Sequence, residues 1–169
     1  MIYQGLHINF KVNLLRIFRN VNTLQLIILT VLLNLIFSLL TTYFTQLLGL
    51  RITANFPPFE SVKEELFAVV ILAPFIETLI FQYFLVNLSI SLTRFLFKRE
   101  SIFLAILLPA VGFGLSHTYN YIYMACTFVS GLIFNTFYII VKYRKQDAYS
   151  CTTIVHGLYN LFIFGLKHI

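Results

Sequence analysis

The sequence predicts an all-α protein, a polytopic transmembrane helical bundle of about five transmembrane helices with an amphipathic helix at the membrane surface before them. Three observations support this prediction. Of the 169 residues, 59% are hydrophobic and 11% are charged, whereas soluble domains carry about 25% charged residues. Long runs of the chain contain no charged residue, and each is long enough for one or two spans of about 20 residues. Lys and Arg gather at alternate ends of these runs, as the positive-inside rule requires.

The apolar runs predict the spans in order. Residues 20–50 contain no Asp, Glu, Lys or Arg and predict the first span, and residues 66–93, interrupted by Glu77 and Gln82, predict the second. Residues 101–141 form a run of 41 residues without these four types, or about 62 Å of helix, roughly twice the hydrocarbon thickness. This run has to fold back, and the polar stretch SHTYNY at residues 116–121 predicts the turn between the third and fourth spans. Residues 148–166 predict the fifth span.

The basic residues predict the orientation of the bundle. They precede the first span, follow the second and follow the fourth: Lys11, Arg16 and Arg19; Arg94, Lys98 and Arg99; Lys142, Arg144 and Lys145. These ends, and the N-terminus with them, are expected in the cytoplasm. The net charge of +6 therefore reflects topology, and we expect the lipid bilayer and no nucleic acid as a partner.

The sequence also predicts the domain organisation. Residues 7–20 combine basic residues with apolar residues at helical spacing, which indicates an interfacial helix. We expect residues 1–20 to form this interfacial segment and residues 21–169 to form a single transmembrane domain. The protein would then be an integral, multi-pass protein of a bacterial plasma membrane.

Four polar side chains lie within or at the ends of these spans, where burying an unpaired polar group is costly. They are Glu77 in the second span, His117 at the end of the third, and His156 and Asn160 on one face of the fifth. A buried carboxylate beside an imidazole can activate a water molecule, and a second imidazole and an amide can stabilise an oxyanion. Three of the four, taken alone, also have a structural interpretation. Asn160 could join two helices, His117 could lie in an interfacial loop, and Glu77 could bind a carbonyl freed by Pro74.

The depth of these residues sets a condition on the fold. His117 stands at a helix end, whereas the other three lie near the middle of their spans. If all four meet, the third helix must continue for about one turn beyond His117, or the bundle must be tilted. Small residues nearby predict close helix packing: Gly112, Gly114, Ala125, Gly131 and Gly157.

The three polar segments resemble the motifs of the CPBP family of intramembrane endopeptidases, which includes CAAX prenyl proteases and bacteriocin-processing, Abi-like proteins. The family motifs are Glu-Glu-x-x-x-Arg, Phe-x-x-x-His and His-x-x-x-Asn. This chain has the corresponding stretches in the same order: ETLIFQ at 77–82, FGLSH at 113–117 and HGLYN at 156–160. The resemblance covers residues 66–166, the expected peptidase-like core. It implies that Glu77 and His117 activate the water and that His156 and Asn160 form the oxyanion site.

The first motif departs from the family pattern at two positions. Thr78 stands in place of the second Glu and Gln82 in place of the Arg. Both members of an acid–base pair, one helical turn apart, are therefore replaced by neutral residues. Losing one partner of a buried pair costs about 3–5 kcal/mol, whereas replacing both can be nearly neutral. We interpret the change as compensated, with Thr78, Gln82 and Phe113 supporting the catalytic residues.

We therefore expect a glutamate-dependent intramembrane peptidase that cleaves a membrane-associated, prenylated or bacteriocin-like peptide without a cofactor. Zinc is the alternative, because Glu77, His117 and His156 match a known catalytic His₂Glu set. Two other functions stay open at this point. The chain could be a weakened family member that acts by binding, as in bacteriocin self-immunity, or a haem protein with His117 and His156 as axial ligands.

Overall fold

The computed structural model describes residues 2–50 and 59–168, and this part of the chain contains six continuous helices and no strand. This result confirms the predicted all-α bundle. The helices are α1 (Ile2–Ile17), α2 (Thr23–Leu47), a 36-residue helix (Val62–Phe97), α6 (Ile102–Leu115), α7 (Tyr121–Tyr143) and α8 (Ala148–Lys167).

Three of these helices are long and apolar enough to cross a membrane by length and composition: α2, the Val62–Phe97 helix and α7. The apolar helix α6 has 14 residues, so it rises about 21 Å, less than the hydrocarbon thickness of about 30 Å. α8 has 20 residues and includes the polar residues His156 and Asn160. Hydropathy thus supports three of the five expected spans, and membrane crossing by α6 and α8 stays a prediction.

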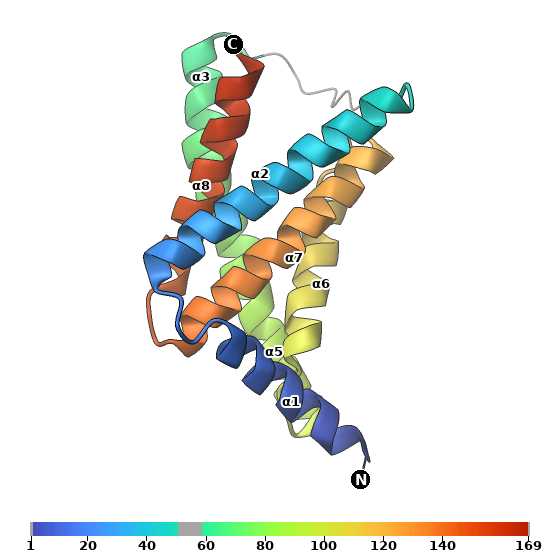
Figure 1. Ribbon diagram of the computed structural model, residues 1–169, viewed down its shortest axis with the longest axis vertical. Helices are drawn as coiled ribbons and strands as arrows, with labels where there is room; N and C mark the ends of the chain where they lie inside the picture. The colour runs from blue at the N-terminus through green and yellow to red at the C-terminus, as the bar shows by residue number, and fades with distance from the viewer. Residues whose placement is uncertain (1, 51–58, 169) are drawn as a thin grey trace.

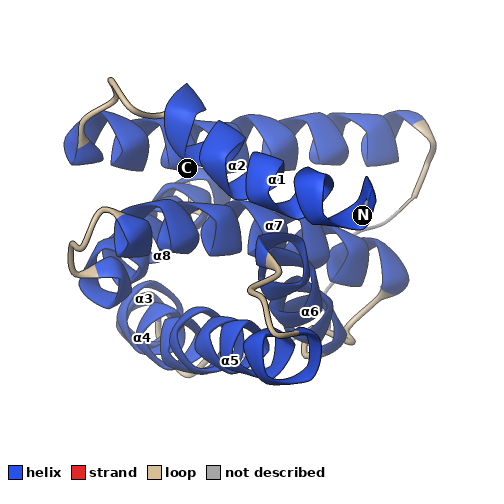
Figure 2. Ribbon diagram, turned by 90° about the horizontal axis from the view of Figure 1, so that it is seen from below, coloured by secondary structure: helices blue, strands red, loops and turns tan. Residues whose placement is uncertain are grey.

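α7 lies inside the bundle, and the other long helices surround it. In Figure 1, α2 lies diagonally across α7 and the lower part of α8, and the two termini lie at opposite ends. Figure 2 shows α1 and α2 as one layer over α7 and α8. On the far side lie α6 and α5 (Val86–Phe97), the last part of the 36-residue helix. Of the most apolar stretch of α7, 56% is buried, against 22% for α2 and for the Val62–Phe97 helix. The latter two helices therefore present most of their apolar surface outward, as expected for contact with lipid.

α6 and α7 approach each other closely because glycines lie at their contact. A Cβ atom added to Gly114 would lie 2.8 Å from Phe128 Cβ, and one added to Gly131 would lie 3.1 Å from Ala110 Cα. These distances confirm the predicted close packing at both positions. The connection between α6 and α7 is the predicted turn, and Asn120 caps α7 by accepting a hydrogen bond from the backbone of Tyr123 at 2.8 Å.

Nine basic residues lie in or beside α1, the turn after Phe97 and the turn after Tyr143, which occupy the lower half of Figure 1. We call this region the basic end: Lys11, Arg16, Arg19, Arg94, Lys98, Arg99, Lys142, Arg144 and Lys145. Two acidic residues, Glu100 and Asp147, lie in the same region. The positive-inside rule places the basic end in the cytoplasm, and this orientation stays a prediction.

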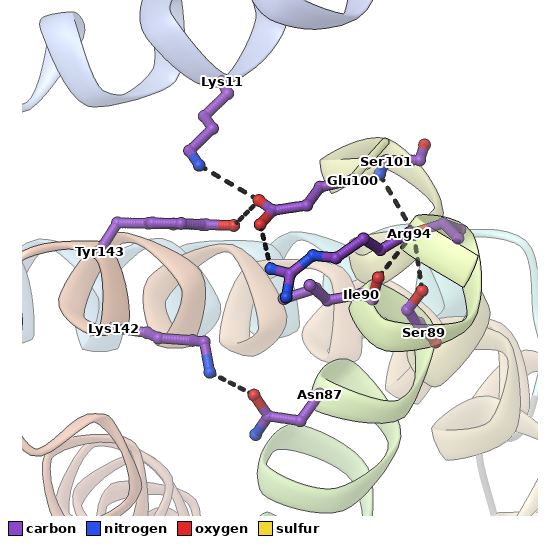
Figure 3. A network of polar contacts seen from close by, with 10 residues as sticks. Lys11, Asn87, Ser89, Ile90, Arg94, Glu100, Ser101, Lys142 and Tyr143 are labelled. Atoms are coloured by element: carbon purple, nitrogen blue, oxygen red, sulfur yellow. Dashed lines mark hydrogen bonds and ion pairs between the residues drawn. The ribbon is translucent and has the colours of Figure 1, made fainter. Parts of the chain in front are cut away.

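Glu100 joins three elements of the basic end (Figure 3). Its carboxylate accepts hydrogen bonds from Lys11 Nζ at 3.2 Å, from the Tyr143 hydroxyl at 2.5 Å and from the Arg94 guanidinium. Partial burial of the carboxyl group opposes ionisation, but these three donors outweigh it and lower the pKa of Glu100 to about 2. Lys11 Nζ also lies 3.8 Å from the centroid of the Tyr143 ring, a favourable cation–π distance. Glu100 thereby holds α1 against the rest of the bundle.

We expect Glu100→Gln to lower stability in detergent by about 1–2 kcal/mol, because the amide keeps the shape of the side chain but loses the charge. Since the pKa of Glu100 is lower in the folded state than in the unfolded state, this stabilisation is complete above the unfolded pKa. It is lost as the pH falls from about 5 towards 2. Melting temperatures between pH 7 and pH 3 should therefore fall more for the wild type than for Glu100→Gln. The control is Glu60→Gln, at an exposed acidic residue near the opposite end. If the melting temperature of Glu100→Gln fell between pH 7 and pH 3 by as much as that of the wild type, the prediction would be contradicted.

Candidate active site

Glu77 lies near the middle of the 36-residue helix, where the helical geometry is irregular. This helix is made of α3 (Val62–Leu66), η1 (Phe67–Leu72), α4 (Ala73–Glu77), η2 (Thr78–Leu85) and α5 (Val86–Phe97). The two η segments are π-helical, a geometry that is frequent at functional sites. Glu77 is the last residue of α4, between the two wide turns, and its side chain is 25% exposed.

Two histidines face the Glu77 carboxylate. His117 Nε2 lies 3.9 Å from Glu77 Oε1, and His156 Nε2 lies 3.7 Å from Glu77 Oε2. Both imidazoles are largely buried, with side chains 14% and 4% exposed. The distances exceed those of direct hydrogen bonds, about 2.7–3.2 Å, but an oxygen atom between the groups could bind two of them. The structure thus brings together three of the four predicted site residues.

His117 reaches this site from a turn and not from a helix. α6 ends at Leu115, and the His117 backbone N–H bonds the Gly114 carbonyl at 3.0 Å. Of the two alternatives expected for the depth of His117, a third helix that continues past it or a tilted bundle, the first is therefore wrong. Because α6 rises only about 21 Å, the turn that follows it lies at the depth of Glu77.

Hydrogen bonds determine the tautomer of His117. Its Nδ1 lies 2.7 Å from the Phe113 carbonyl oxygen and 3.0 Å from Ser116 Oγ. A carbonyl oxygen only accepts, so Nδ1 carries the proton and donates it to Phe113. Nε2 therefore presents its lone pair towards Glu77, where it can accept a proton.

His156 has the opposite arrangement. Its Nδ1 is buried and has no hydrogen-bond partner among the described residues. A proton on Nε2 would face the Glu77 carboxylate, whereas a proton on Nδ1 would face no acceptor, so the Nε2–H tautomer is favoured. The Phe134 ring lies against the imidazole, with centroids 4.7 Å apart and an interplanar angle of 31°. His156 therefore presents a donor at the site where His117 presents an acceptor.

Two further aromatic residues contact these imidazoles. The Phe113 ring centroid lies 4.7 Å from that of His117 and 6.0 Å from that of His156, so the predicted supporting residue contacts both. Tyr123, which the sequence analysis did not identify, lies with its ring centroid 5.7 Å from that of His117. The signal that could have revealed it is the helix cap at Asn120, because an Asn N-cap places the third following residue back against the turn.

Asn160 lies on the next turn of α8 after His156 and binds backbone. Its Nδ2 donates a hydrogen bond to the Val69 carbonyl oxygen at 2.8 Å. In a π-helix each N–H bonds the carbonyl five residues earlier, so the donor for Val69 would be residue 74. That residue is Pro74, which has no N–H, and Asn160 supplies the missing hydrogen bond. The position of Asn160 matches its structural interpretation, and its catalytic role stays a prediction.

Other residues of α8 also contact the irregular backbone of the 36-residue helix. A Cβ atom on Gly157 would lie 3.1 Å from the Val70 carbonyl oxygen, so a larger residue there would push the helices apart. The Tyr149 hydroxyl donates a hydrogen bond to the Phe75 carbonyl oxygen at 3.2 Å. These contacts hold α8, which carries His156, against η1 and α4, which lead to Glu77.

Thr78 and Gln82, the two altered positions of the first motif, are fully buried. Gln82 Nε2 donates to Asn135 Oδ1 at 3.1 Å, and Asn135 Nδ2 donates to the Ile106 carbonyl oxygen at 2.8 Å. Thr78 Oγ1 and Gln82 Oε1 have no hydrogen-bond partner among the described residues. Gln82 stands where the family motif has Arg. The side-chain amides of Gln82 and Asn135 therefore link η2 to α7 and α6 without a charged group. That contact fits the supporting role predicted for Gln82.

Comparison with known proteins agrees with the resemblance of the motifs. Residues 63–162 match the family model described as type II CAAX prenyl endopeptidase Rce1-like. The match covers 100 of the 169 residues and includes Glu77, His117, His156 and Asn160. No curated protein and no solved structure matches the chain. The chain therefore belongs to the Rce1-like family of type II CAAX prenyl endopeptidases.

Proposed function

We propose that this protein is a glutamate-dependent intramembrane endopeptidase that hydrolyses a peptide bond of a lipidated, membrane-associated peptide. Membership of the family supports a CAAX-type intramembrane endopeptidase in general. The observation that carries the finer proposal is the position of the Glu77 carboxylate, 3.9 Å and 3.7 Å from the Nε2 atoms of two histidines with opposite tautomers.

Glu77 and His117 activate the water in this mechanism. A water bound between them gives one proton to the Glu77 carboxylate or to the His117 Nε2 lone pair, and its oxygen attacks the scissile carbonyl carbon. The tetrahedral intermediate then collapses, the C–N bond breaks, and the leaving nitrogen takes the proton back from the same base. The products are a carboxylic acid and an amine, and the enzyme returns to its starting state.

His156 and Asn160 stabilise the negative charge that develops on the carbonyl oxygen. The Nε2–H of His156 points into the site and can donate to that oxygen. Asn160 Nδ2 carries two hydrogens, of which one bonds the Val69 carbonyl oxygen. The second hydrogen can serve the oxyanion, so one amide fills a structural and a catalytic role.

The direct test is cleavage of peptides that end in a CAAX sequence, with and without a prenyl group, by protein reconstituted in liposomes. We propose that the wild type releases a shortened product whose new carboxyl group carries one oxygen from ¹⁸O-labelled water, as detected by mass spectrometry. A folded protein that cleaves none of the peptides would contradict the proposal.

Binding without cleavage is the second candidate function, as in bacteriocin self-immunity. One observation favours it: Thr78 and Gln82 are neutral where the family motif is charged, which could leave Glu77 less well positioned. In that case the wild type and Glu77→Gln would retain the same partner equally well, without releasing a product. A haem site is less compatible with the geometry, because both His Nε2 atoms face the Glu77 carboxylate and not an open axial position.

We expect the activity to withstand removal of metal ions. A His₂Glu set can bind catalytic zinc, but among the side chains that the structure describes, in residues 10–50 and 59–168, no three His, Cys, Asp or Glu are placed to hold a metal ion together. The measurement is the rate of peptide cleavage before and after treatment with EDTA. Activity that EDTA abolishes and stoichiometric zinc restores would show that the water is metal-bound.

A further inference from the structure

A groove between α2 and α7 is lined almost entirely by apolar side chains. Its volume is about 200 Å³, and its walls include Leu26, Leu29 and Leu33 of α2 and Ile133 and Ile140 of α7. Leu29 and Leu33 are about half exposed, at 45% and 49%. The groove therefore lies on the outer surface of the bundle, where lipid would contact it.

The two threonine hydroxyls in the groove are already hydrogen-bonded, so they do not require a polar ligand. The hydroxyl of Thr30 donates to the Leu26 carbonyl oxygen at 2.7 Å, and that of Thr136 donates to the Leu132 carbonyl oxygen at 2.7 Å. Because both hydroxyls bond their own helix, the groove presents carbon atoms to its occupant. An alkyl chain matches this lining.

One end of the groove reaches the basic end of the bundle. Phe18, between α1 and α2, lines the groove, and its carbonyl oxygen accepts a hydrogen bond from the Arg144 guanidinium. Arg16 and Arg19 flank Phe18 in the sequence, and both are exposed. No acidic side chain among the described residues forms an ion pair with Arg16, Arg19 or Lys145. Positive charge is thus concentrated at one end of an apolar groove.

The depth of the groove fits one leaflet of a bilayer. From Ile140 to Leu132, α7 rises about 12 Å, and half of the hydrocarbon core is about 15 Å. We propose that the groove binds an acyl chain of an anionic phospholipid whose phosphate lies among Arg16, Arg19, Arg144 and Lys145. Guanidinium groups suit this headgroup because they bind phosphate oxygens in pairs.

The absence of tryptophan from the chain allows a site-specific test. Leu29→Trp places a single fluorophore in the groove, and brominated phosphatidylglycerol or phosphatidylcholine in the liposome quenches it on contact. We expect about fivefold preference for the anionic lipid at this position, the effect of roughly one basic side chain at a membrane surface. Leu88→Trp, on the outer surface of α5 and 47% exposed, should show no preference.

Arginine variants then identify the headgroup site. In the Leu29→Trp background, Arg16→Gln with Arg19→Gln should remove the preference, whereas Lys98→Gln, in the turn after α5, should keep it. Ile133→Trp, on the α7 wall of the groove, should report the same lipid preference. This second reporter controls for any effect that Trp at position 29 itself has on lipid binding. Equal quenching by both lipids at position 29 would overturn the proposal. So would the absence of quenching by either lipid, which would indicate that a second copy of the chain covers the groove. The assay needs no catalytic turnover, so its outcome is independent of the proposed peptidase activity.

Discussion

Glu77→Gln should reduce peptide cleavage by about three orders of magnitude or more while leaving the protein folded, because removal of a catalytic base from an active site has effects of this size. Glutamine keeps the length and shape of the side chain, but its amide cannot take a proton from water. His117 would remain with its Nε2 lone pair, 3.9 Å from the altered side chain, but without the carboxylate that shares its water. The melting temperature should stay the same or rise, because a charge buried in the membrane domain is costly.

Single-turnover cleavage in liposomes and melting temperature in detergent measure these two effects separately. Glu60→Gln, which makes the same chemical change at an exposed position just before α3, serves as the matched control and should cleave like the wild type. If Glu77→Gln kept activity within tenfold of the wild type, activation of the water would not require Glu77. The central step of the proposed mechanism would then be wrong.

Gly114→Ala should have the second-largest effect, acting on both stability and activity. The added Cβ atom would lie 2.8 Å from Phe128 Cβ and 3.0 Å from the Met124 carbonyl oxygen. A backbone carbonyl cannot rotate away as a flexible side chain can, so α6 and α7 would have to separate, at about 1–3 kcal/mol. Gly114 lies three residues before His117, and a displacement of about 1 Å there should lower the cleavage rate about 100-fold.

Gly165→Ala is the matched control for this substitution. Gly165 is also in a helix, and a Cβ atom added to it would meet no other atom within 4 Å. Alanine is favoured over glycine in helices by roughly 0.5–1 kcal/mol, so this variant should be at least as stable as the wild type and fully active. If the two variants gave the same melting temperature, the close contact between α6 and α7 would not matter for folding.

The helical segments were predictable from the sequence to within a few residues. The apolar run at residues 20–50 became α2 (Thr23–Leu47), and residues 148–166 became α8 (Ala148–Lys167). Two segments differ more from their expected ends. The surface helix expected at residues 7–20 is α1 (Ile2–Ile17), and the second span, expected at residues 66–93, is part of a 36-residue helix (Val62–Phe97). The earlier start of the 36-residue helix is explained by Ser61, whose side chain accepts a hydrogen bond from the Glu64 backbone at 3.1 Å and caps the helix in a charged stretch.

The polar contacts of the site were predictable only in part. The order and spacing of the motifs identified Glu77, His117 and His156, and these three side chains meet in the structure. The sequence did not reveal that Asn160 binds the carbonyl of Val69, because that bond depends on a π-helical turn before Pro74. It also could not show which residue Gln82 binds.

Membrane helices follow from the local sequence because, without water, each backbone N–H and C=O must be satisfied within its own segment, and a long apolar run satisfies them only as a helix. The sequence by itself therefore determined the helical class, the approximate helix ends and the identity of the polar residues between them. The tertiary structure decided which side chains meet, because each such contact joins segments far apart in the chain. Gln82 and Asn135 are 53 residues apart, and Asn160 and Val69 are 91 apart. Glycine contacts between helices and the short α6 set the depth at which His117 reaches Glu77, and no local pattern encodes that distance.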